Sequence, residues 1–242
     1  MWFTQGELVR ARAALTRAHA LAVGAGDAEM VVRADDLFAR VEHANGSLNA
    51  ARDRFASAIA GFEALAIPWG VGNAQIGMAA VAAATGEIDQ AEHLLDGAIS
   101  VLQHAGPWFL TRAMFLRGIL ALRRGDPDAA IAMVRDSLTR IRELHDKFAL
   151  VYALVPLAAA AVLRGDDAWA ARILGARDAV AERTGATIVL KLVHDLREQA
   201  EREARAHLGP DRWARAYAAG RKTSLDSLLA DIDRALTARA GV

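Results

Sequence analysis

A period of about 40 residues runs through the sequence and limits the folds that the chain can adopt. Glycines mark this period at nearly equal intervals: Gly6, Gly46, Gly86, Gly125 and Gly165. An alanine stands five residues after each of them: Ala11, Ala51, Ala91, Ala130 and Ala170. A large apolar residue stands nine residues after each: Leu15, Phe55, Leu95, Val134 and Leu174. A fixed spacing in this range is typical of stacked supersecondary units, which bury their apolar faces against their neighbours.

The repeating unit is predicted to be a helical hairpin. In the clearest copy, Asp126 suits the N-cap because its carboxylate can accept from the free N–H groups of the first turn, and Pro127 suits the first helical position. Aromatic residues make up only 6% of the chain and alanine is abundant, which favours helices that pack closely. We call the helix before each repeat glycine A and the helix after it B. B helices are expected over 6–23, 48–65, 88–103, 127–144 and 167–183, and A helices over 29–44, 68–84, 106–124 and 147–163.

The last part of the chain departs from the period and is predicted to cap the array. Residues 188–207 form one charged, amphipathic helix, and Gly209-Pro210 ends it. A short helix over 211–219 and a final helix capped by Ser224 follow. Terminal repeats differ from the others because they cover an open end. We therefore expect an all-α solenoid of about five helix-turn-helix repeats over 1–187 and capping helices over 188–242.

The first repeat is incomplete. It has its B helix, but only residues 1–5 stand where an A helix is expected. An uncapped end of a repeat array exposes apolar surface. Two explanations stay open: the chain is a fragment of a longer protein, which we favour, or this end packs against another chain.

Composition argues against several classes of protein. The 29 Lys and Arg residues balance the 29 Asp and Glu residues, whereas a nucleic-acid binder usually carries a basic excess. There is no cysteine, and the seven histidines lack the spacing of metal ligands. No signal peptide is visible, and the longest apolar run, 148–163, is shorter than the roughly 20 residues that span a bilayer. We expect a soluble, cytoplasmic protein with no cofactor and no contact with membrane or nucleic acid.

The spacing of the glycine, the alanine and the large apolar residue resembles the tetratricopeptide repeat. The common repeat has about 34 residues, so the helices here are expected to be longer. The resemblance implies a right-handed superhelix whose A helices line the concave surface. Long repeats of this type are similar to the C-terminal sensor regions of large bacterial ATP-dependent transcription regulators of the LuxR-family and maltose-regulator kind.

Three local matches narrow the resemblance to these regulators. Pro68-Trp69-Gly70-Val71 and Pro107-Trp108-Phe109-Leu110 resemble the openings of their A helices. Residues 170–176 resemble their last repeat, and 208–213 with 219–226 resemble their terminal segment. The chain departs from them in two ways, since it has no Gly-x-x-x-x-Gly-Lys-Ser/Thr motif and no helix-turn-helix after the repeats. The resemblance therefore implies that the chain corresponds to the sensor region of such a regulator, without its ATPase module or its DNA-binding domain.

Two columns of equivalent A-helix positions form the candidate ligand site. Seventeen residues before successive glycines stand Glu29, Trp69, Trp108 and Phe148. Thirteen before them stand Arg33, Asn73, Arg112 and Tyr152. An aromatic column beside a polar one provides flat faces for stacking and donors for orientation. The alternative is that Trp69, Trp108 and Phe148 pack against the preceding B helix as part of the core.

A proline inside a predicted helix, a pair of adjacent aspartates and a charged run are each expected to have a structural role. Pro156 lies inside an A helix, where it kinks the helix or leaves the carbonyl of Tyr152 free for a ligand; we favour the kink. Asp35 and Asp36 are expected to point apart, as neighbours on a helix do. The run from Arg197 to Arg205 alternates in sign and is typical of a solvated face.

The sequence predicts a non-catalytic binding module, because no constellation of catalytic residues stands out. It would recognise a small effector or a peptide in the groove of the array, as the regulatory part of a bacterial transcription regulator. The alternative is a protein–protein scaffold or homodimer that uses the open first repeat. An exposed apolar patch near residues 1–23 would favour this scaffold.

Overall fold

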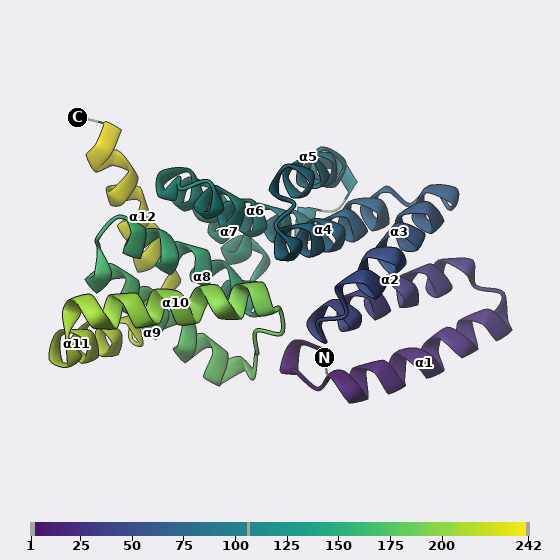
Figure 1. Ribbon diagram of the computed structural model, residues 1–242, viewed down its shortest axis with the longest axis horizontal. Coiled ribbons are helices and arrows are strands. Elements are labelled where there is room, and N and C mark those ends of the chain that lie inside the picture. The colour runs from purple at the N-terminus through teal and green to yellow at the C-terminus, as the bar shows by residue number, and fades with distance from the viewer. Residues whose placement is uncertain (1–2, 106, 241–242) are drawn as a thin grey trace. The chain divides into compact units, whose positions relative to one another are not determined.

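The structure, a computed structural model, describes residues 3–105 and 107–240 of the chain. Within these ranges every regular element is a helix (Figure 1). The elements are η1 (Phe3–Gln5), α1 (Leu8–Ala25), α2 (Ala28–Ala44), α3 (Leu48–Ala64), α4 (Pro68–Thr85), α5 (Ile88–Ala105), α6 (Pro107–Arg123), α7 (Pro127–Leu144), α8 (Lys147–Leu163), α9 (Asp167–Thr184), α10 (Lys191–Leu208), α11 (Pro210–Gly220) and α12 (Leu225–Ala240). The prediction of an all-α helical-repeat fold is confirmed.

The repeat glycines end the helices or turns that precede each B helix. All five have a positive φ, between 77° and 84°, a conformation that glycine adopts without steric cost. At Gly86 the next residue, Glu87, donates its N–H to the carbonyl of Ala82, which satisfies an acceptor at the end of α4. Asp126 caps α7 as predicted and accepts from the backbone N–H of Ala129 at 2.9 Å. The regular spacing of the glycines is therefore a spacing of left-handed turns.

The recurring alanines are buried in every repeat, and the large apolar residues are buried in all repeats except the first, where Leu15 is half-buried. Ala51, Phe55, Ala91 and Leu95 are fully buried. Phe55 and Phe62 of α3 lie so close to the backbone of α4 that a side chain at Gly77 or Gly70 would overlap their rings. The A and B helices thus pack at close range, because small residues of one helix lie opposite large residues of the other.

Packing divides the chain into two compact units. Unit 1 comprises residues 1–113 with 189–191, and unit 2 comprises 114–188 with 192–242. In unit 1, α1 packs on α2, α2 on α3, α3 on α4 and α4 on α5. In unit 2, α7 packs on α8, α8 on α9, α11 on α9 and α12 on α7. The predicted division into an array over 1–187 and a cap over 188–242 stays a prediction.

Differences from the predicted boundaries are small. The helix predicted from residue 188 begins at Lys191 as α10, after an irregular segment. Gly106, the first residue of the A helix predicted over 106–124, lies outside the described residues, as do Met1 and Trp2. None of the helices in the described ranges has the length and apolar character needed to cross a membrane.

Candidate functional site

The predicted aromatic column in unit 1 centres on Trp69, which lies near the start of α4 and is half-buried. The Arg33 guanidinium of α2 lies 4.7 Å from the centroid of the Trp69 ring. Phe109 of α6 stacks on Trp69 with centroids 5.6 Å apart and an angle of 10° between the rings. Phe62 of α3 packs against Trp69 with centroids 5.7 Å apart. Because Phe62 belongs to the preceding B helix, Trp69 makes the core contact that the alternative interpretation predicts.

Asn73 lies one turn further along α4 and is buried, with only 5% of its surface exposed. Its Nδ2 donates to Asp36 Oδ2 at 3.0 Å, and its Oδ1 accepts from Arg112 Nη1 at 3.1 Å. Its backbone carbonyl accepts from Arg40 Nη2 at 2.8 Å. The structure thus brings Asn73 and Arg112 together, as part of an internal polar network in which Asn73 is held by protein groups.

Asp36 and Arg40 of α2 complete this network, and the sequence analysis did not identify the pair. Arg40 donates to both carboxylate oxygens of Asp36, at 3.0 and 3.1 Å, and both side chains are buried. Burial and the charge of Arg40 lower the pKa of the nearby His43 to about 4. The four-residue spacing of Asp36 and Arg40 on a helix was the available signal. Asp35 points away from Asp36, towards Arg54 and His19, as expected for adjacent residues on a helix.

The remaining predicted residues have more contact with solvent. Trp108 is 49% exposed and packs edge-on against Phe109. Phe148 is 40% exposed near the start of α8 in unit 2. Tyr152, one turn later, is half-buried and donates from its hydroxyl to the carbonyl of Thr187 at 3.1 Å. Pro156 is buried inside α8, which continues through it.

A cavity of about 290 Å³ lies in unit 2 between α6, α8 and α10. Its apolar lining residues are Ile119, Leu122, Ala159, Val162, Leu163, Leu192, Leu196 and Ala200. Its polar lining residues are Arg123, Asp195, Gln199 and Glu203. Ligand sites typically combine apolar walls with a few polar groups and begin at about this volume.

The polar groups of this cavity come mainly from one face of α10. Asp195, Gln199 and Glu203 are four residues apart, a spacing that aligns side chains along a helix. Gln199 donates from Nε2 to Glu203 Oε1 at 2.9 Å. With Arg123 counted, the lining carries a formal net charge of −1. The arrangement therefore suits a molecule with an apolar body and a positively charged group. Helical periodicity could have revealed this row of polar residues, which the sequence analysis did not identify.

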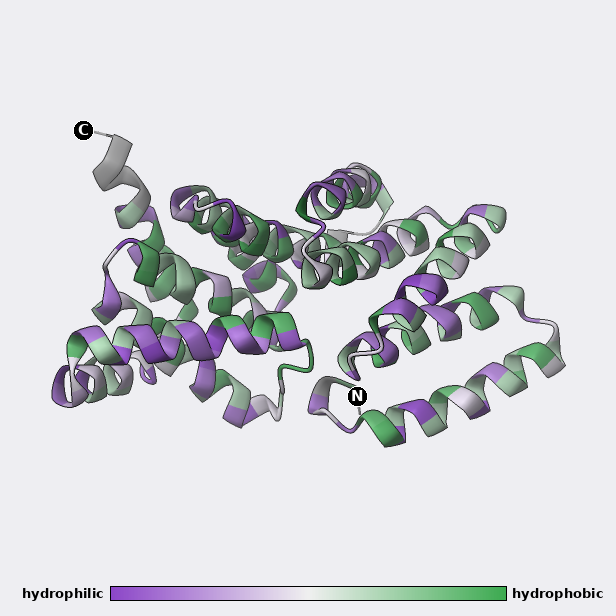
Figure 2. Ribbon diagram, in the orientation of Figure 1, coloured by the Kyte–Doolittle hydropathy of each residue, from purple (hydrophilic) through white to green (hydrophobic). Residues whose placement is uncertain are grey.

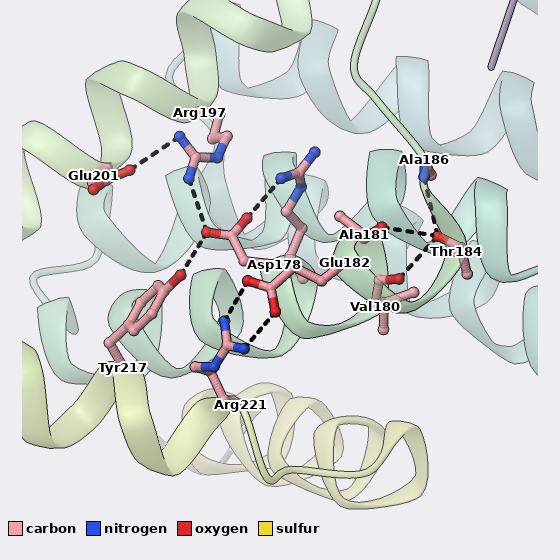
Figure 3. Close-up of polar contacts among 11 residues, drawn as sticks. Asp178, Val180, Ala181, Glu182, Thr184, Ala186, Arg197, Glu201, Tyr217 and Arg221 are labelled. Atoms are coloured by element: carbon pink, nitrogen blue, oxygen red, sulfur yellow. Dashed lines mark hydrogen bonds and ion pairs between the residues drawn. The ribbon is translucent and has the colours of Figure 1, made fainter. Parts of the chain in front are cut away.

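A second cluster, centred on Asp178 of α9, fixes the helices around it (Figure 3). Its carboxylate accepts from Arg177 at 2.6 Å, from Arg197 of α10 at 2.9 Å and from the Tyr217 hydroxyl of α11 at 2.7 Å. Burial raises the pKa of Asp178, but these hydrogen bonds outweigh burial and hold it below its ordinary range. Arg197 is half-buried here, so the predicted solvated face of 197–205 does not begin at this residue. The cluster ties α10, one wall of the cavity, to α9 and α11.

Comparison with known proteins does not assign the chain to a family. No protein-family model matches the chain, and no curated protein sequence matches it. In the described ranges, no group of three or more His, Asp or Glu side chains is arranged to hold a metal ion. The proposal of a function therefore depends on the geometry of the cavity and of the exposed surfaces.

Proposed function

We propose that this protein is a non-catalytic binding module whose unit 2 cavity takes a small effector with an apolar body and a cationic group. The observation that carries the proposal is the cavity between α6, α8 and α10, with its apolar walls and the carboxylates of Asp195 and Glu203. The buried polar side chains elsewhere join helices to one another: Asn73 bonds to Asp36 and Arg112, and Asp178 bonds to Arg197 and Tyr217.

Binding at this cavity would act on the position of α10. A ligand between α8 and α10 contacts both helices, so it stabilises the conformations in which they are held together. The Asp178 cluster transmits the position of α10 to α9 and α11 through Arg197 and Tyr217. The resemblance to sensor regions of bacterial transcription regulators supports a regulatory setting of this kind, in which the cytoplasmic module passes the signal to other domains or a protein partner.

A charge-matched pair of small probes tests the proposal. We expect n-hexylamine to bind and hexanoate to bind more weakly, because the two share an apolar chain but carry opposite charges. A molecule of this size should bind with a Kd of about 1 mM. Chemical-shift titration by NMR would measure both and locate the affected residues.

Variants of α10 provide the controls for this titration. Asp195→Asn combined with Glu203→Gln should weaken hexylamine binding, whereas Glu198→Gln, an exposed acid outside the cavity, should not. Equal binding of the two probes, or shifts confined to other parts of the chain, would contradict the proposed site.

A second candidate function, a protein–protein scaffold that uses the exposed side of α1, is favoured by the residues on that surface. Val9, Leu21 and Val23 are 85%, 75% and 57% exposed. Exposed apolar side chains gathered on one helix are typical of an interaction surface. We propose this function as an addition to effector binding, since α1 belongs to unit 1 and the cavity to unit 2.

A further inference from the structure

The outer side of α1 carries a line of apolar and small residues with the spacing of a coiled-coil seam. Val9, Ala13, Thr16, Ala20 and Val23 are alternately four and three residues apart, and all five are exposed. The opposite side of α1 packs on α2 through buried Ala11 and Ala22. Figure 2 shows hydrophobic residues along the length of α1. The helix is therefore apolar on two sides, although only one is covered within the described part of the chain.

The repeat allows this line to be compared with the same positions in the other B helices. Equivalent positions are those at the same distance from the repeat glycine, which is Gly6 before α1, Gly46 before α3 and Gly86 before α5. In α3 the line is Asn49, Asp53, Ala56, Ala60 and Glu63, and in α5 it is Asp89, His93, Asp96, Ser100 and Gln103. All ten residues are exposed, and most are polar or charged. Solvent-facing B helices of this chain thus carry polar residues where α1 carries valines.

In unit 2 the same line is covered by another helix. On α9 it includes Gly175, where a side chain would overlap the backbone carbonyl of Tyr217 in α11. On α7 it includes Arg135 and Arg142, which pair with Asp233 and Asp226 of α12 at 2.6 and 3.2 Å. The chain therefore uses this line to dock helices, once through small residues and once through arginines that meet aspartates.

The charges that flank the line on α1 have one sign. In heptad terms the line occupies the a and d positions, and Arg10, Arg12, Arg17 and His19 occupy e and g positions beside it. α1 contains no acidic residue. Arg12 pairs with Glu42 of α2 at 2.5 Å, and Arg10 lies 3.6 Å from Glu7, just before α1. Arg10 and Arg17 are both exposed. Residues at e and g select the partner by charge, so two copies of α1 would repel each other and an acidic helix would be attracted.

We propose that α1 docks an acidic, amphipathic helix of a partner protein along the line from Val9 to Val23. The partner helix places small or apolar side chains against the line and Asp or Glu beside Arg10 and Arg17. α12 pairs aspartates with arginines of α7 in a related way, although those arginines lie on the line itself. The proposal rests on the scaffold function proposed above and names its partner class. It does not depend on effector binding at the cavity.

A pair of designed peptides tests the proposal on the full chain. The first is a helical peptide of about three heptads with Ala and Leu at a and d and Glu at e and g, and the second has Lys in place of Glu. Because each flanking ion pair adds a modest amount, we expect the Glu peptide to bind about tenfold or more tightly than the Lys peptide. Fluorescence anisotropy would measure both affinities.

Two alanines at equivalent positions provide matched variants. Ala20 of α1 and Ala60 of α3 stand at the same distance from their repeat glycines, Gly6 and Gly46, and both are exposed. Ala20→Glu should abolish binding of the Glu peptide, and Ala60→Glu should leave it unchanged. Equal affinity for the two peptides, no binding of either, or equal effects of the two variants would overturn the proposal.

Molar mass by light scattering separates the failure of this proposal from the failure of the scaffold function. We expect the mass to be the same for the chain and for Ala20→Glu. A dimer that Ala20→Glu converts to a monomer would make a second copy the occupant of α1, which overturns the acidic partner but keeps the scaffold. A monomer that binds neither peptide would count against both the acidic partner and the scaffold function.

Discussion

At the scale of single residues, unit 1 combines an apolar core with a charged pair that is satisfied inside it. Asp36, Arg40 and Asn73 form hydrogen bonds that join α2 to α4, and Arg112 extends them to α6. Such a buried pair is not by itself strongly stabilising, because desolvation opposes the attraction of the charges. We infer that it fixes which residues of α2 and α4 face each other.

The Asp36 pair leads to a prediction at this scale. Asp36→Ala should lower the free energy of unfolding by about 3–5 kcal/mol, because it leaves the buried Arg40 guanidinium without its carboxylate. Asp35→Ala removes a partly exposed carboxylate with only longer ion pairs, so it should cost no more than about 0.5 kcal/mol. Urea denaturation of both variants would compare these effects. Similar losses would show that the buried pair has no special importance.

At the scale of elements, glycine has two different uses in this chain. The repeat glycines provide left-handed turns, whereas Gly175 and Gly220 allow α9 and α11 to approach each other closely. A side chain at Gly220 would overlap the carbonyl of Arg172, just as one at Gly175 would overlap that of Tyr217. α11 can therefore cover α9 only because Gly175 and Gly220 have no side chains.

Alanine substitution distinguishes this close contact from an ordinary helical glycine. Gly175→Ala should destabilise unit 2 by about 1–3 kcal/mol, because α11 must move away. Gly97→Ala in α5 should instead stabilise the chain by up to about 1 kcal/mol, since the nearest neighbouring atom is 3.6 Å away and alanine favours helix. Thermal unfolding would give the sign of each change, and hydrogen exchange would show faster exchange in 210–220 for Gly175→Ala. Unchanged exchange there would contradict the close-packing explanation.

At the scale of the whole molecule, stability depends on pH through His43 and Asp178, two groups whose pKa is lowered by folding. His43 is held neutral by burial and by Arg40, and Asp178 is held charged by Arg177, Tyr217 and Arg197. A lowered pKa means that the unfolded chain binds protons more readily than the folded chain. Stability is therefore lost as the pH falls, first through His43 and then through Asp178.

The window for His43 follows from its two pKa values. Between the ordinary value of 6.5 and the folded value of about 4, only the unfolded chain takes up the proton. The free energy of unfolding should therefore fall by about 2 kcal/mol from pH 7.5 to pH 5 through this histidine. His43→Gln should remove that part of the pH dependence, and His93→Gln, at an exposed position of α5, should not. Urea denaturation at pH 7.5 and pH 5 would measure the change in the free energy of unfolding. If His43 is not the group responsible, His43→Gln will leave that change unaltered.

The sequence alone determined the helical hairpins, their period and the identity of the core positions. These features depend on local rules: a left-handed glycine ends a turn, an aspartate caps the next helix, and apolar residues recur on one face of it. Ala51, Phe55 and Leu95 are buried where the period predicts. The helix bounds agree for the same reason.

The tertiary structure alone decided which polar residues are internal and where a cavity remains. Asn73 was predicted to face a ligand but is buried because Asp36, far earlier in the chain, meets it across the interface of α2 and α4. The cavity of unit 2 exists because α10, outside the period, lies against α6 and α8. Local periodicity places a side chain on a face of its helix, but the packing of distant helices determines what that face meets.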